Sequence, residues 1–230
     1  MLGLSFGTGA LDAATYLGLH GVFTANMTGN VVFIGLGVAG SEGIPLLRST
    51  LALAGFVLGA VVVGLLQRHK DVVRNTDGIA ALTFAAVALV LAGTAVVLGF
   101  ATLSTPVLDL MTIALALAMG AQAVAARRVG VADVSTVVVT STLAGLAAEN
   151  SWTGDLAGRA VTHRRLAAVL SMGLGAVAGA FLLRWSIAVP VALSAAIVLV
   201  VAAVSGWRFA RRTRSARPDR ARRGVPVGHR

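Results

Sequence analysis

The first forty residues form an apolar run that is too long for one membrane helix and is interrupted near its middle. A continuous helix over residues 2–40 would be roughly 60 Å long at ~1.5 Å per residue, about twice the hydrocarbon thickness of a bilayer. The interruption is the stretch 21–30, GVFTANMTGN, which contains glycines and side chains that need hydrogen-bond partners. Free backbone groups in hydrocarbon are tolerated only where protein buries them or a wet cavity solvates them. The first segment is therefore predicted to be a discontinuous helix.

Composition places the whole chain in a membrane. Of its 230 residues, 57% are hydrophobic and 12% are charged, against roughly 25% charged in soluble domains. One soluble core cannot hide so much apolar surface, whereas a bilayer can. Apolar stretches of spanning length cover residues 49–66, 79–101, 164–183 and 185–207. A further apolar segment, 106–148, is again too long for one crossing, so we expect it to be discontinuous as well.

The distribution of basic residues predicts the topology. The links 67–77 and 149–165 and the tail 208–230 are basic, whereas the links near 40–45 and 102–106 carry no positive charge. Cytoplasmic loops carry the excess of Lys and Arg, so the basic links and the tail are predicted to be cytoplasmic. The result is an all-α polytopic membrane protein of about six transmembrane elements, with both termini in the cytoplasm.

The net charge of +10 comes largely from arginines that follow the last apolar segment. Such a basic flank sets the orientation of the chain and is attracted to anionic lipid. We therefore expect this region to meet the lipid bilayer and no specific nucleic acid. Residues 208–230 are expected to form a disordered cytoplasmic tail.

An internal repeat relates the two halves of the chain. An offset of 116 positions places residues 24–29 on residues 140–145 and the apolar span 49–67 on 165–183. Three elements in each half require the second half to insert upside down, because an odd number of crossings inverts the copy. The predicted architecture is a 3+3 inverted repeat with discontinuous first and fourth helices. Its two membrane repeats are residues 1–101 and 106–207.

Two blocks of sequence resemble a known family. The first comprises GALDA at 9–13, YL at 16–17 and the interrupted stretch 21–30, and the second comprises MGAQ at 119–122, AARR at 125–128 and residues 140–147. Together they resemble the YoaK-like family of bacterial integral membrane proteins, a domain of unknown function. Ser141 and Ala144 stand where that family often has Gly and Thr. The resemblance implies a compact multi-span protein of the bacterial inner membrane, and it implies no substrate.

The two interruptions supply most of the candidate site. Hydroxyl and amide side chains there can cap the helix that restarts after each break, and glycine permits the turn. Such a helix directs its positive N-terminal end into the membrane, where it would favour an anion. The alternative is that these small residues only allow close helix packing. The candidates are Asn26, Thr28, Gly29 and Asn30 at the first break, and Thr140, Ser141 and Thr142 at the second.

Ionisable and amide side chains near the breaks complete the candidate site. The offset of 116 relates Asp12 to Arg128, so we predict that Asp12 pairs with Arg128 or Arg127 across the pseudo-two-fold axis. The alternative is that Asp12 lies near the interface and that the arginines stop a helix on the cytoplasmic side. Gln122 could line the same cavity. His20 could titrate or bind an ion, or it could form an ordinary hydrogen bond.

No enzyme signature is found in the sequence. It has no Walker-type loop, no Gly-x-Ser-x-Gly elbow, no cluster at metal-ligand spacing and no cysteine. We therefore expect no enzymatic activity, no cofactor and no metal. The alternative is an intramembrane hydrolase that uses Asp12 and Asp133 as paired carboxylates.

The favoured function is a small secondary transporter or channel for a small, anionic solute, with its site at the crossing of the two broken helices. One alternative is a non-transporting membrane scaffold that acts through lipid or a partner protein. Another is a cation or proton channel that depends on Asp12 and His20. A homodimer is expected, because six short elements bury little surface between themselves.

Overall fold

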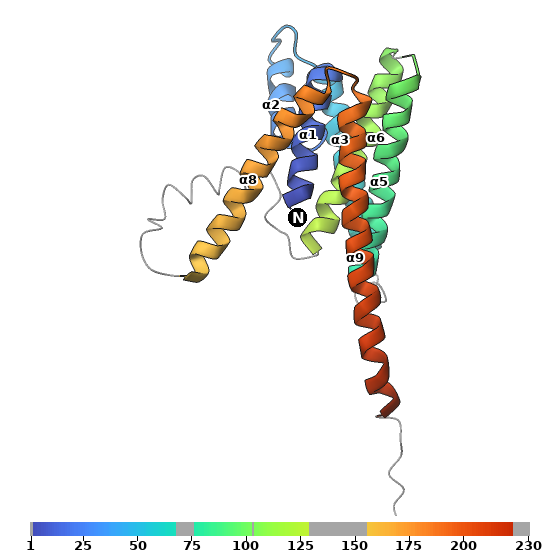
Figure 1. The fold of residues 1–230 in the computed structure, drawn as a ribbon. Helices are drawn as coiled ribbons and strands as arrows, with labels where there is room; N and C mark the ends of the chain where they lie inside the picture. Colours follow the sequence, from blue (N-terminus) through green and yellow to red (C-terminus); the bar gives the residue numbers. More distant parts are fainter. Residues whose placement is uncertain (1, 68–75, 103, 129–155, 223–230) are drawn as a thin grey trace, which may run out of the picture.

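The structure is a computed structural model that describes residues 2–67, 76–102, 104–128 and 156–222. Within these ranges the fold is all-helical, with seven helices and no strand. The helices, shown in Figure 1, are α1 (Leu2–Gly18), α2 (Met27–Val38), α3 (Leu46–Leu66), α5 (Thr76–Phe100), α6 (Thr105–Arg128), α8 (Leu156–Leu182) and α9 (Ala188–Arg222).

Several of these helices suit a bilayer. Among the described residues, α3, α5, α6 and α9 are long and apolar enough to cross a membrane, while α2 and the apolar part of α8, Leu166–Leu182, are shorter. Large apolar side chains cover the outside of the helices, and Leu58, Leu89 and Leu199 are more than half exposed. In water such a surface would be an aggregation liability, whereas lipid tails solvate it. The coarse prediction of an all-α polytopic membrane protein is confirmed.

Local sequence sets several helix boundaries. Pro106 and Pro190 lie in the first turns of α6 and α9, where the missing N–H leaves no hydrogen bond unmade. Just before α9, the Ser186 hydroxyl accepts the Ala188 N–H at 3.2 Å. Helix α6 is continuous to Arg128, so any break in the predicted segment 106–148 lies beyond it, outside the described residues.

Helix α9 is longer than one crossing and reaches well below the rest of the bundle (Figure 1). The part of the tail up to Arg222, which we expected to be disordered, is helical. The start of α1 and the end of α9 point toward the same side of the bundle.

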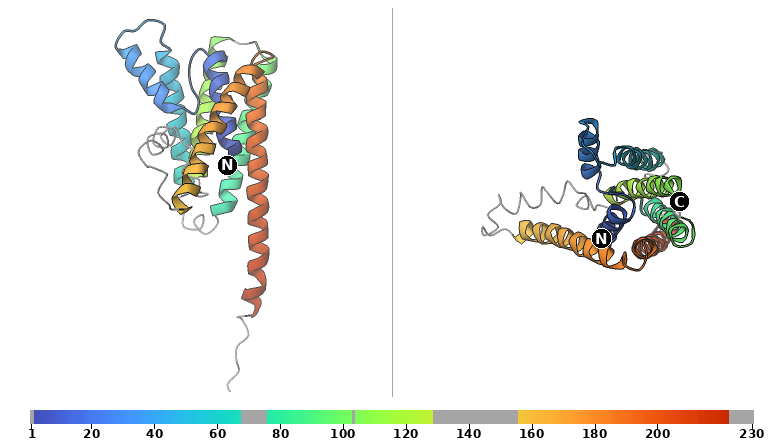
Figure 2. Two further views of the ribbon diagram at one scale, coloured as in Figure 1. Left: turned by 60° about the vertical axis from the view of Figure 1, so that its left-hand side comes forward. Right: turned by 90° about the horizontal axis from the view of Figure 1, so that it is seen from above.

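The helices interlock across the two halves of the chain. α1 packs against α8, α3 against α6, and α5 against α9. α5 also contacts α6, and α1 contacts α9, while α2 lies against α3 at the periphery (Figure 2). Each main pairing therefore joins a helix from the first half to one from the second.

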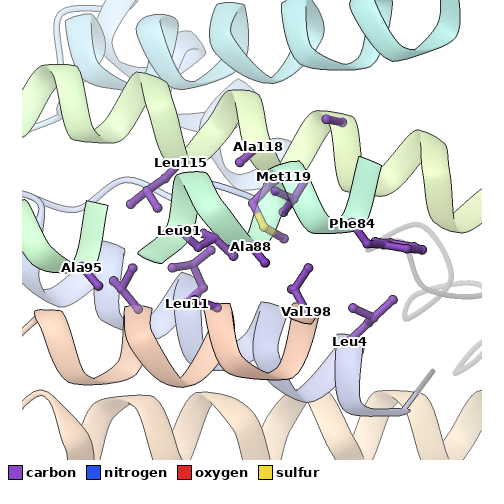
Figure 3. Packing of buried hydrophobic residues seen from close by; sticks show 14 of the residues in the cluster. Leu4, Leu11, Phe84, Ala88, Leu91, Ala95, Leu115, Ala118, Met119 and Val198 are labelled. Atoms are coloured by element: carbon purple, nitrogen blue, oxygen red, sulfur yellow. The ribbon is translucent and has the colours of Figure 1, made fainter. Parts of the chain in front are cut away.

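The hydrophobic core lies where α1, α5, α6 and α9 meet. Leucine, valine and alanine dominate it, and Phe84 is its largest fully buried side chain. Alanine at the contacts lets these helices approach closely. Membrane helices associate through such close packing, because lipid tails are as apolar as the side chains and supply no hydrophobic driving force. Figure 3 labels ten members of this core: Leu4, Leu11, Phe84, Ala88, Leu91, Ala95, Leu115, Ala118, Met119 and Val198.

Glycines bring the backbones of α3 and α6 into direct contact. A Cβ atom on Gly59 would overlap the Leu117 carbonyl oxygen, and one on Gly120 would overlap the Phe56 carbonyl oxygen. Neither position can therefore carry a larger residue unless the two helices move apart.

Glycines also bring the backbones of α1 and α8 into direct contact. A Cβ atom on Gly175 would overlap the Phe6 carbonyl oxygen, and one on Gly9 would overlap the Met172 carbonyl oxygen. The Ser171 hydroxyl also donates to the Leu2 carbonyl at 2.8 Å. These contacts fix how far α8 can lie from α1.

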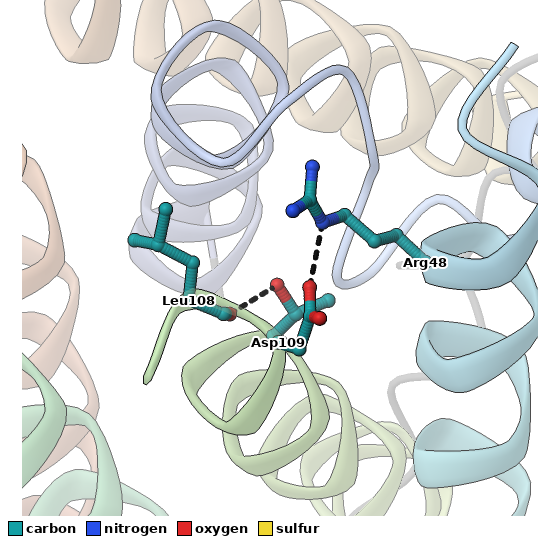
Figure 4. Close-up of polar contacts among 4 residues, drawn as sticks. Arg48, Leu108 and Asp109 are labelled. Carbon is teal, nitrogen blue, oxygen red and sulfur yellow. Dashed lines mark hydrogen bonds and ion pairs between the residues drawn. The ribbon is translucent and has the colours of Figure 1, made fainter. Parts of the chain in front are cut away.

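An ion pair joins α3 to α6 where both helices begin (Figure 4). Arg48 Nε lies 2.6 Å from Asp109 Oδ1, and the two side chains are 18% and 22% exposed. Exposed pairs of this kind contribute roughly 0–1 kcal/mol. The pair still matters for topology, because Asp109 neutralises an arginine at an end of the bundle that the predicted topology places outside the cytoplasm.

The glycine contacts lead to a stability prediction. Gly175→Ala should lower the free energy of unfolding by about 1–3 kcal/mol, because the added methyl group forces α8 away from α1. The matched control is Gly173→Ala on the same helix, where a Cβ atom would meet nothing within 4 Å. Thermal unfolding of both variants in detergent measures the difference. Equal melting temperatures would contradict the described packing of α8 on α1.

Candidate functional site

Residues 19–26 separate α1 from α2 and turn the chain back on itself. The Gly21 N–H donates to the Tyr16 carbonyl at 2.9 Å and closes the end of α1. His20 and Gly21 have positive φ angles of 63° and 80°, a conformation that glycine adopts freely and histidine only occasionally. The reversal therefore depends on two successive left-handed residues.

Asp12 holds the returning chain against α1. Its side chain is 4% exposed, and Oδ1 accepts the Thr24 N–H at 3.0 Å and the Ala25 N–H at 2.8 Å. Hydrogen bonds to a carboxylate are stronger than those between neutral groups. Asp12 lies roughly 9 Å below Gly18, the end of α1, at ~1.5 Å per residue. The start of α2 therefore lies below the end of α1, at the depth of Asp12, on the peripheral side of the bundle.

Asn30 secures the same returning chain from α2. This residue is fully buried, its Oδ1 accepts the Phe23 N–H at 3.1 Å, and its Nδ2 donates to the Phe23 carbonyl at 2.7 Å. Both backbone groups of Phe23 are thereby satisfied without a helix or a sheet. Gly29 makes room for this arrangement, because a Cβ atom there would lie 2.8 Å from the Phe23 ring.

The first turn of α2 is capped by its own sequence. Asn26 Oδ1 accepts the Gly29 N–H at 3.4 Å, as N-cap residues do. Thr28, one residue into the helix, is exposed. The rings of Tyr16 and Phe23 stack at 4.9 Å between centroids, and Phe33 lies 6.0 Å from Phe23. This aromatic cluster covers one side of the break.

Two buried oxygen atoms at the break have no hydrogen-bond partner among the described residues: Asp12 Oδ2 and Thr24 Oγ1. Thr24 is fully buried, and its hydroxyl lies beside the Asp12 carboxyl. A buried polar atom without a partner costs about 1–3 kcal/mol, and each such atom calls for a structural or functional reason. Thr24 was not predicted as a site residue, because nothing in the sequence distinguishes it from the other small polar residues of the interrupted stretch.

No described hydrogen bond joins the remaining predicted residues to Asp12. Gln122 on α6 is 5% exposed, and in the described part of the chain its Oε1 has no partner. Arg127 is exposed near the end of α6, and His20 is exposed at the reversal. The described hydrogen bonds of the Asp12 side chain go to backbone amides.

The rest of the predicted site cannot be placed. The side chain of Arg128 and the residues Thr140, Ser141 and Thr142 lie outside the described residues. The pairing of Asp12 with an arginine and the second half of the site therefore stay predictions. Within the described ranges, no group of three or more His, Cys, Asp or Glu residues is placed to hold a metal ion.

A separate open groove lies between α2, α3 and α6. Its volume is about 670 Å³, and it is lined mainly by apolar side chains such as Ile34, Val38 and Leu47, with Arg48 and Asp109 among its polar residues. An apolar lining suits lipid chains better than a polar solute. The break between α1 and α2 is therefore the better candidate site.

Comparisons with known proteins agree with a membrane protein. A family model described as "Protein of unknown function (DUF1275)" matches residues 1–204. The UPF0700 transmembrane protein YoaK of Bacillus subtilis (strain 168) is 36% identical over 139 residues, which is 60% of this chain and 60% of that protein. The matched region thus spans less than two thirds of the relative's length. No solved structure gives a significant match. The resemblance found in the sequence is confirmed.

The role of Asn30 can be tested through stability. Asn30→Ala leaves the N–H and the carbonyl of Phe23 without partners, so it should cost about 1–3 kcal/mol for each group. Thermal unfolding in detergent measures the loss. Val31→Ala is the neighbouring control, because Val31 is 54% exposed. If both variants melt at the same temperature, Asn30 does not hold the break.

Proposed function

The chain belongs to the DUF1275 family of proteins of unknown function, and we propose that it is a small secondary transporter or channel for a small solute in the bacterial inner membrane. The observation that carries this proposal is the start of α2 at the depth of Asp12, beside the two unpartnered oxygens of Asp12 and Thr24 in the described part of the chain. Secondary transporters bind solutes and ions at such interrupted helices near the middle of the membrane.

The pattern of helix pairing supports an inverted repeat around this site. Exchanging α1 with α6, α3 with α8 and α5 with α9 turns the α1–α8 pairing into the α6–α3 pairing. It likewise turns α1–α9 into α6–α5, and it leaves α5–α9 unchanged. This is the exchange that a two-fold axis between the two halves would make.

The glycine contacts follow the same exchange. Each of these glycines faces a backbone carbonyl. The exchange relates the Gly59–Leu117 contact to the Gly175–Phe6 contact. It also relates the Gly120–Phe56 contact to the Gly9–Met172 contact. The correspondence needs the offset of 116 positions between α3 and α8 and an offset of 111 between α1 and α6. The shorter offset relates Asp12 to Ala123, the neighbour of Gln122, rather than to Arg128.

This register suggests the composition of the site. The first half contributes the N-terminal end of α2 with Asp12, Thr24 and Asn26. The second half contributes Gln122, whose Oε1 has no partner among the described residues, together with the predicted hydroxyls of 140–142. Arg127 and Arg128 lie at the end of α6, where they add positive potential at that end of the bundle. Helix N-termini and arginines favour a small anion.

Transport can be tested without knowing the natural solute. Liposomes that contain the purified protein should swell faster than empty liposomes in isosmotic potassium salts of small inorganic or carboxylate anions, with valinomycin present in both to carry the balancing potassium ion. Thr24→Val removes the buried hydroxyl at constant shape, and it should slow swelling by about tenfold, the equivalent of ~1.4 kcal/mol. Thr83→Val is the control, because its hydroxyl bonds only to the Ile79 carbonyl of its own helix.

The same assay separates transport from the scaffold alternative. Deletion of residues 208–230 should leave swelling unchanged in a transporter, whereas a scaffold that acts through this basic tail would lose its cellular phenotype. Wild-type liposomes that swell no faster than empty ones in any of these salts would overturn the proposal.

Water access to the break gives an independent prediction. The chain has no cysteine, so Thr24→Cys introduces a single thiol. A membrane-impermeant maleimide should label this thiol in proteoliposomes if the break opens to water. A cysteine at Ala88, which is 4% exposed in the core, is the control that should stay unlabelled. Equal and negligible labelling at both positions would mean that the break is a dry packing contact.

A further inference from the structure

We propose that Asp12 Oδ2 is a proton-binding site inside the membrane, and that its proton controls how firmly residues 22–26 are held against α1. The proton site itself follows from the geometry of the break. Its use in transport rests on the proposed function.

The two oxygens of the Asp12 carboxyl have different surroundings. Oδ1 accepts two backbone N–H groups, from Thr24 and Ala25, whereas Oδ2 is buried and has no hydrogen-bond partner in the described ranges. A proton would therefore bind to Oδ2. A hydrogen on Oδ1 would point at the two N–H groups that already donate to that oxygen.

The Thr24 hydroxyl can form a hydrogen bond with the Asp12 carboxyl in both its ionised and its protonated state. It lies beside the Asp12 carboxyl, within reach of a hydrogen bond to it. A hydroxyl can donate to an ionised oxygen and can accept from a protonated one. Rotation of one O–H bond therefore accommodates the change of charge, and no heavy atom has to move.

No described charged side chain compensates the carboxylate. Asp12 lies on α1, which packs against α8, α9 and the reversal that contains His20. The described charged or titratable side chains of these elements and of the α8–α9 link are exposed, and none is bonded to Asp12. These are His20, His163, Arg164, Arg184, Arg208 and Arg211. The ion pair of Arg48 with Asp109 joins other helices. Among the described side chains, none is a cation that competes with a proton for this carboxylate.

Protonation of Asp12 weakens the hydrogen bonds that hold residues 22–26 against α1. The step moves a proton from a hydronium ion to Oδ2, so that one O–H bond of the hydronium breaks, an O–H bond to Oδ2 forms and neutral water is left. Oδ1 then belongs to a neutral acid, and hydrogen bonds to a neutral acceptor are roughly half as strong as those to a charged one. The Thr24 and Ala25 amides are held less firmly, and the N-terminal end of α2 no longer faces a negative charge. An anion can then approach that end of the helix.

Infrared difference spectroscopy of the full chain in lipid nanodiscs tests the proton site directly. Acidification of the wild type should produce a carboxylic-acid carbonyl band that Asp12→Asn lacks. Asn keeps the Oδ1 acceptor and places N–H donors at the Oδ2 position, so the variant should fold. Asp109→Asn removes a carboxyl at the outer end of α6 and should keep the band. An Asp12→Asn spectrum identical to that of the wild type would overturn the proposal.

Hydrogen exchange tests the effect on the chain. Exchange of a peptide that covers residues 22–26, corrected for the intrinsic pH dependence of exchange, should become about fivefold faster in acid for the wild type, which corresponds to ~1 kcal/mol. In Asp12→Asn the corrected rate should not change with pH. An unchanged wild-type rate would overturn the control of the break by this proton.

The two proposals can fail separately. A titrating Asp12 band without anion-dependent swelling would uphold the proton site and remove the transporter. Swelling that persists while the Asp12 band never appears would uphold transport and remove the proton site.

Discussion

The hydrogen bonds from the Thr24 and Ala25 amides to Asp12 are the interaction on which the rest of the break depends. Residues 19–26 are not helical, and hydrocarbon offers no water to their backbone groups. Asp12 supplies acceptors from α1, and Asn30 satisfies both backbone groups of Phe23 from α2. A side chain on each side thus replaces the missing helix bonds, and α2 can begin at the depth of Asp12.

Around this break the helices form a frame of close backbone contacts. The α1–α8 and α3–α6 pairs meet through glycines that face carbonyl groups, and such contacts fix helix separation more tightly than flexible side chains do. The break contrasts with this frame, because it is held by a few hydrogen bonds, and two of them are accepted by the ionisable Asp12 carboxyl.

Much of the fold could be predicted from the sequence, because apolar length along a chain is local information. The apolar spans 49–66, 79–101 and 164–183 agree with α3, α5 and α8 to within a few residues at most ends, apart from the start of α8, which extends beyond its apolar part into the basic link. The stretch 21–30 also indicated an interruption, since glycine and asparagine there have no place in a lipid-exposed helix, although the non-helical residues are 19–26 and residues 27–30 begin α2. The helical extension of α9 was missed, because its arginines resemble a disordered basic tail.

The sequence by itself determined that this chain is a helical membrane protein, where its first segment is interrupted, and which family it resembles. Only the tertiary structure decided which atoms meet. It turned Asp12 toward the Thr24 and Ala25 amides, paired Arg48 with Asp109, and brought glycines of α3 and α6 against carbonyls of the facing helix. The physical reason is that helix rotation and helix pairing depend on contacts between residues far apart in the chain. Hydrophobicity and helix breaking depend only on neighbouring residues in the sequence.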